Sequence, residues 1–79
     1  MNRAELQAAF VREGVRPTAY SLDGSEPESR YVLALRHGGW AVYFCERGRE
    51  IDVEEFDTED EACSELLLRV LGDPTTRVR

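Results

Sequence analysis

The side chains of this chain that are able to do chemistry are concentrated in one acidic stretch, from position 46 to position 65. This stretch holds ten carboxylates against the two guanidiniums of Arg47 and Arg49, so its local net charge is −8. Dense carboxylates in proteins hold hard cations, exchange protons in catalysis, or attract a positively charged partner. They also serve simply to solubilise a sheet edge and to cap a helix, which is the alternative without a specific function.

The spacing of these acids does not favour a metal or a cofactor. A calcium loop needs oxygen ligands at set alternating positions around a glycine, and the run from Asp57 to Glu61 lacks that pattern. The glycines form turns and make neither a phosphate loop nor a nucleotide-binding motif. We therefore expect no metal, no cofactor and no enzymatic activity.

The cysteines and the histidine also argue against a metal site. Cys45, Cys63 and His37 are too few and too widely spaced for a zinc site. We expect both cysteines to be reduced and buried as small apolar side chains, and His37 to be exposed in a His-Gly-Gly turn.

Length and charge limit the remaining possibilities. The chain has 79 residues, 10 basic and 16 acidic, with a net charge of −6. We expect a single domain over residues 1–79, because a chain this short buries only about 60% of its unfolded surface. The acidic balance argues against nucleic-acid binding. Neither a signal peptide nor a membrane span is evident, so we predict a cytoplasmic protein.

Two helices are predicted at the two ends of the chain. Asn2 and Glu5 form a capping box, which predicts a helix over about residues 3–13 that stops at Gly14. Thr58 begins a second box, so the second helix starts at Glu59 and is closed by Gly72 and the proline that follows.

The segment from Val15 to Ser29 loses all periodicity and collects turn residues, which predicts a long structured loop. Either Tyr20 and Leu22 pack on the core and hold this loop against it, or Tyr20 and Asp23 form part of a binding edge. The sequence leaves both open.

Residues 31–35 and 40–45 are predicted to form the two strands of a hairpin. Their core face is predicted to consist of Tyr31, Leu33, Leu35, Trp40, Val42 and Phe44. Tyr43 then points the other way, with Val32 and Ala34, toward solvent or a partner.

A third strand is predicted over residues 50–54, with Ile51 and Val53 facing the core. Glu50, Asp52 and Glu54 would lie on the opposite face beside Tyr43. Phe56 has the wrong parity, so a bulge is expected at Glu54–Glu55, or the strand ends there, with Phe56 covering the bottom of the core. The last residues, Thr75–Arg79, are expected to form a short basic tail that is frayed at its end.

Together these elements predict a two-layer α+β fold of order α-β-β-β-α, with a three-stranded antiparallel meander packed against two helices. The acids around Tyr43 would then form a docking surface for a basic partner.

Segments spread over nearly the whole chain also carry a resemblance to one group of proteins. They are Ala19–Gly24, Trp40–Tyr43, Glu46–Gly48, Phe56, Glu61–Cys63 and Asp73–Arg77. On these segments the chain resembles small bacterial proteins encoded beside polymorphic toxins, whose C-terminal domain is often an NAD-glycohydrolase of the tuberculosis-necrotizing-toxin type. It departs from their pattern at Phe44-Cys45, where Tyr-Ser is expected.

The resemblance implies an immunity protein that inhibits a cognate toxin by covering a basic active-site cleft. The residues expected to bind the partner are Tyr43, Asp52, Glu54, Glu50, Asp23 and Tyr20. Two other functions remain open: an acidic adaptor or regulatory module that adds a strand at the sheet edge, and an inhibitor of a nuclease toxin.

Overall fold

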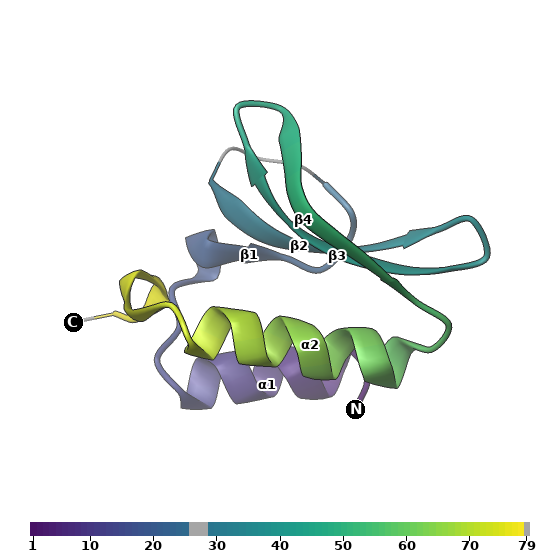
Figure 1. Cartoon of the computed structure of the whole chain (residues 1–79). Coiled ribbons are helices and arrows are strands. Elements are labelled where there is room, and N and C mark those ends of the chain that lie inside the picture. The colour runs from purple at the N-terminus through teal and green to yellow at the C-terminus, as the bar shows by residue number, and fades with distance from the viewer. Residues whose placement is uncertain (26–28, 79) are drawn as a thin grey trace.

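Two helices lie side by side beneath a twisted four-stranded sheet in the computed structural model, which describes residues 1–25 and 29–78 (Figure 1). The α+β class and the order of the helices and the meander are as predicted. The elements are α1 (Arg3–Arg12), the 3-10 turn η1 (Pro17–Ala19), β1 (Tyr20–Ser21), β2 (Arg30–Arg36), β3 (Gly39–Glu46), β4 (Arg49–Phe56), α2 (Glu59–Leu71) and the 3-10 turn η2 (Pro74–Thr76).

The prediction of three antiparallel strands was wrong in one respect, since the sheet has the order β1-β2-β3-β4. Strand β1 pairs parallel to β2, with Tyr20 opposite Tyr31 and Ser21 opposite Val32, so the sheet is mixed. Two residues leave no alternating pattern in a sequence, which is why β1 was included in the predicted loop. Residues 26–28 of that loop lie outside the described residues.

Both helices begin where the capping residues predict. Asn2 and Glu5 exchange the two bonds of a capping box at α1, and the Thr58 side chain accepts from the Glu61 amide at α2. The two helix starts are linked, because the Arg3 amide donates to the Glu59 carboxylate over 2.8 Å. The helices therefore run in the same direction beneath the sheet (Figure 1).

Both hairpins close through two residues in the left-handed region. The φ angles are 54° at His37 and 76° at Gly38, then 53° at Arg47 and 73° at Gly48. Such turns match the right-handed twist of the strands they join. His37 is exposed, as predicted.

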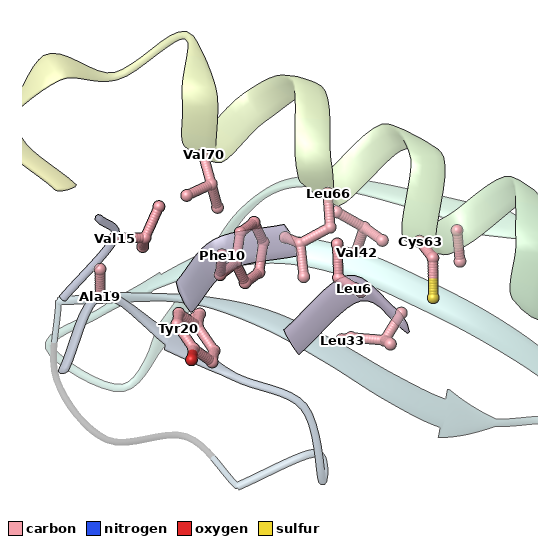
Figure 2. Packing of buried hydrophobic residues seen from close by; sticks show 11 residues of the cluster. Leu6, Phe10, Val15, Ala19, Tyr20, Leu33, Val42, Cys63, Leu66 and Val70 are labelled. Atoms are coloured by element: carbon pink, nitrogen blue, oxygen red, sulfur yellow. The ribbon is translucent and has the colours of Figure 1, made fainter. Parts of the chain in front are cut away.

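The main core fills the space between the helices and the sheet (Figure 2). Its buried residues are Leu6, Phe10, Val15, Ala19, Tyr20, Leu33, Val42, Ala62, Cys63, Leu66 and Val70. Tyr31, Trp40 and Phe56 pack against it while partly buried, in line with their predicted positions. Leu35 was also expected in the core, but it is 66% exposed.

A second buried cluster lies on the sheet face away from the helices. It consists of Val32, Ala34, Ala41, Tyr43 and Cys45. The prediction that Tyr43, Val32 and Ala34 face solvent or a partner was wrong, because Tyr43 and Val32 are fully buried and Ala34 nearly so. The chain after β1 approaches this face closely: a Cβ on Gly24 would lie 3.6 Å from that of Ala34. Cys45 in this cluster and Cys63 in the main core are both buried, as expected, and they are not joined in a disulfide.

Strand β4 contains a bulge that the sequence placed two residues too late. Val42 pairs with Glu54 and Phe44 pairs with Ile51, so Asp52 and Val53 together lie opposite Tyr43. The extra residue reverses the alternation beyond it and brings Glu54, not Val53, to the helix side. Ile51 and Val53 are 37% and 44% exposed, so the prediction that both are core residues was wrong.

The C-terminal segment is held against the fold as far as the described residues extend. Val15 and Arg77 form a β-bridge, and the Val78 amide donates to the Gly14 carbonyl over 2.6 Å. Thr76 is buried and donates to the Val70 carbonyl. The backbone of the basic tail is therefore bonded to the chain after α1 through residue 78, and Arg79, where fraying was predicted, lies outside the described residues.

Candidate functional site

Half of the acidic residues between positions 46 and 65 are neutralised by ion pairs. The paired acids are Glu50, Glu54, Glu59, Asp60 and Glu65. In the described part of the chain, no cation lies within 4.0 Å of Glu46, Asp52, Glu55, Asp57 or Glu61. Exposed negative charge therefore collects along β4 and the turn that leads from it into α2.

The structure does not bring the six predicted binding residues together. Tyr20 and Asp23 belong to the β1 edge of the sheet, whereas Asp52 and Glu54 lie on β4 at the other edge. Tyr43 and Glu50 lie on the face away from the helices, since Glu50 pairs with Cys45 of the outer cluster. The six residues therefore form three separate groups.

The first group holds the loop after β1. Tyr20 is 8% exposed and its ring lies 4.6 Å from that of Phe10, so it belongs to the core. Asp23 accepts hydrogen bonds from the Ser25 hydroxyl, the Ser25 amide and the Ser21 hydroxyl. These donors, Ser25 first, lower the pKa of Asp23 to about 2. Asp23 is thus an ionised turn former.

The second group fastens the hairpins to each other. Arg36 donates two bonds to the Glu50 carboxylate, at 3.0 and 2.9 Å, and its guanidinium lies 4.9 Å from the centre of the Tyr43 ring. The hydrogen bond to Glu50 is the main reason that the pKa of Arg36 is raised. Tyr43 is thus held inside the fold and is not a free aromatic anchor.

The third group is organised by Arg69, a residue that the sequence analysis did not single out. Its guanidinium donates to the Glu65 carboxylate over 2.7 Å, to the Asp52 carbonyl over 2.8 Å and to the Glu54 carboxylate over 3.1 Å. These bonds tie α2 to the bulge of β4. Asp52 itself has a φ of 55°, in the left-handed region that Asp tolerates better than most residues.

Beside Arg69 the surface is hollowed by a pocket of about 580 Å³. Its lining consists of Tyr31, Phe44, Ile51, Asp52, Arg69 and Asp73. The β3–β4 hairpin rises away from the helices (Figure 1). Ile51 of this hairpin lines the pocket and is 37% exposed.

One wall of this pocket is formed by two aromatic rings, and a hydrogen bond holds one of them in place. The rings of Tyr31 and Phe44 meet edge to face, with centroids 4.9 Å apart. The Tyr31 hydroxyl donates to Asp73 over 3.0 Å. Burial, with help from this bond, raises the pKa of Tyr31 to about 12. The pKa of Asp73 is lowered, chiefly by the Thr75 hydroxyl, so Asp73 is ionised near neutral pH.

A wider hollow of about 720 Å³ lies at the β1 edge, beside the start of α1. Three of its charged groups already have partners: Arg3 lies 3.8 Å from Glu59 and donates to the Leu22 carbonyl, while Asp23 is held by the two serines. We therefore take the smaller pocket by β4, with its unpaired Asp52, as the candidate site.

Over residues 1–25 and 29–78, no group of three or more His, Cys, Asp or Glu side chains is arranged to hold a metal ion. None of the helices in the described part of the chain is long and apolar enough to cross a membrane. Comparison with protein-family models, with curated proteins and with solved structures finds no match to this chain.

Proposed function

We propose that this chain is an immunity protein that binds and inhibits a cognate toxin, an NAD-glycohydrolase, by covering the toxin's active-site cleft. The observation that carries the proposal is the exposed acidic edge: every residue of β4 before Phe56 is exposed, and Asp52 and Glu55 have no cationic partner among the described residues. The resemblance of segments such as Ala19–Gly24 to proteins encoded beside toxins supplies the class of partner.

The acidic edge suits inhibition of an enzyme that binds a dinucleotide. Such an enzyme needs positive charge in its cleft to hold the pyrophosphate of the substrate. An acidic surface accelerates association with a basic cleft by a factor of about 10 to 1,000, and an inhibitor in a producing cell must act quickly. The contact surface that we propose is the helix side of β4 around Asp52 and Glu54, because Tyr43 is buried.

The test is survival and intracellular NAD in bacteria that express the C-terminal domain of the neighbouring large reading frame, with and without this chain. We expect the chain to restore growth, preserve NAD and co-purify with the toxin domain. If the toxin kills without consuming NAD, the target belongs to another toxin class. If the chain neither rescues growth nor forms a complex, the proposal is wrong.

A matched pair of variants tests the surface. Asp52→Asn removes an unpaired charge on β4 and keeps a residue that tolerates a positive φ. Glu13→Gln removes one exposed charge at the end of α1. We expect Asp52→Asn to slow association with the toxin several-fold at low salt and Glu13→Gln to have a smaller effect. Equal effects would contradict the assignment of the surface.

The second candidate is an adaptor that accepts a strand from a basic partner at the free edge of β4, which the position of β4 at the end of the sheet favours. The bulge at Asp52–Val53 and the bond from Arg69 to the Asp52 carbonyl interrupt that edge, so we place this function second. An inhibitor of a nuclease would instead preserve nucleic acid in the same expression experiment.

A further inference from the structure

We propose that the pocket between β4 and α2 receives an arginine side chain of the partner protein. This inference rests on the proposed function and deepens it, because it names the chemistry of the group that the partner inserts. The pocket is the one lined by Tyr31, Phe44, Ile51, Asp52, Arg69 and Asp73, with a volume of about 580 Å³.

The apolar part of the lining suits the body of an arginine. Tyr31 and Phe44 are partly buried, and their rings are fixed edge to face against each other. Ile51 is 37% exposed beside them. A guanidinium stacks on an aromatic face, while its three-carbon stem covers an aliphatic side chain such as that of Ile51. Buried aromatic walls of this kind are where interface energy concentrates.

The charges around the pocket select a cation. Asp52 has no cationic partner among the described residues, and Asp73 is ionised and fixed by donors from Thr75 and Tyr31. Arg69 is balanced by Glu54 and Glu65. With Arg16, whose charge acts on Asp73, four carboxylates lie around two guanidiniums, and the resulting net charge of −2 opposes an anionic occupant and favours a cationic one.

Arg69 is largely engaged within the chain, which leaves it little capacity to bind an anion from a ligand. Its Nε, Nη1 and Nη2 atoms each donate one hydrogen bond to an acceptor of the chain itself, at 2.7, 2.8 and 3.1 Å. Removing those bonds would leave Glu65 and Glu54 without their partner. Arg69 therefore acts as a wall of the pocket that positions Asp52.

Arginine fits this arrangement better than lysine does. A guanidinium presents a flat face to the rings and a fork of donors to a single carboxylate, such as that of Asp52. A lysine ammonium is a strongly hydrated point charge that offers neither the flat face nor the paired donors. The experiment below separates the two cations.

The experiment is an NMR titration of the full ¹⁵N-labelled chain with N-acetyl-arginine amide. The neutral isostere N-acetyl-citrulline amide and N-acetyl-lysine amide serve as comparison probes. We expect saturable shifts in the millimolar range for arginine, centred on Phe44, Ile51 and Asp52, since one side chain supplies little affinity. We expect citrulline to give no saturable shift and lysine to bind at least threefold more weakly.

Two matched variants make the test specific to the pocket. Asp52→Asn should weaken arginine binding at least threefold, whereas Asp57→Asn, an exposed acid outside the pocket, should leave it within a factor of about two. Ile51→Ala should also weaken binding, and the same spectra report whether each variant is folded. Equal binding of citrulline or lysine, equal effects of the two Asp variants, or no saturable shift would each overturn the inference.

Because this titration uses no toxin, its failure is distinct from failure of the proposed function. Rescue of growth together with no arginine binding would overturn the pocket assignment alone. Arginine binding together with no rescue and no complex would support the pocket and overturn the proposed function.

Discussion

Strands β3 and β4 are paired neighbours of eight residues each, yet their side chains have opposite surroundings. In β3 the residues Ala41, Val42, Tyr43 and Cys45 are buried, on both faces of the sheet. In β4 no residue is buried, although Ile51 and Val53 alternate with acids as in a half-buried strand. A strand can therefore be fixed by backbone pairing and a few polar contacts while most of its side chains remain exposed.

We expect the largest change in the free energy of unfolding when a buried ring is removed from β3. Tyr43→Ala should lower the free energy of unfolding by about 3–5 kcal/mol, because the ring is fully buried and covered by Arg36. Val53→Ala on β4 should cost less than about 1 kcal/mol. Urea denaturation of both variants measures the difference, and similar losses would show that the two strands contribute alike.

A smaller effect is expected from the side chain that fastens β4 to α2. Arg69→Met keeps much of the side-chain length but removes bonds to Asp52, Glu54 and Glu65, so we expect a loss of about 1–2 kcal/mol. Arg49→Met is the control, since Arg49 is exposed on β4 and forms no ion pair within the described residues. Equal losses for the two variants would argue against a specific role of Arg69.

The smallest expected effect is on the pH dependence of stability. It comes from Asp23 and Asp73, which accept hydrogen bonds within the fold, unlike the unpaired acids of β4. The pKa of Asp23 is lowered from 3.8 to about 2, and that of Asp73 is lowered too. Stability from these two groups is therefore present above the ordinary pKa and lost as the pH falls through their folded values. Chemical denaturation between pH 5 and about 2 should show a shallower loss for Asp73→Asn than for the parent chain. Identical slopes would contradict this role.

Much of the fold was predictable because it depends on local signals. Asn2 and Thr58 cap their helices, and the glycines at 38 and 48 allow the positive φ of the two hairpin turns. The partly buried position of Phe56 was also predicted, because its wrong parity called for a bulge or the end of the strand before it. Each of these features is decided within a few residues of the chain.

The remaining features depend on contacts between distant segments. Burial of Tyr43 requires Arg36 and the approach of Gly24 to the outer face, which alternation along β3 does not encode. The short parallel strand β1 has no pattern of its own. Of the predicted site, the acidic character of β4 is present in the structure, but its grouping with Tyr43 and Asp23 is not, because the bulge turns Glu54 toward Arg69.

Because of the bulge, the number of residues in β4 helps to determine which face of the sheet each of its side chains takes. Four residues of β4, from Ile51 to Glu54, lie opposite three of β3, from Val42 to Phe44. Deleting Val53 would leave Asp52 alone opposite Tyr43 in a regular ladder, with Glu54 and Phe56 still opposite Val42 and Trp40. Deleting Glu55, which lies beyond the bulge, would instead turn Phe56 away from α2 or shift the hairpin register. The contacts of Phe56 in NMR spectra of the two deletions would distinguish these outcomes. In this strand the site of a one-residue deletion is therefore expected to decide whether the surface is preserved.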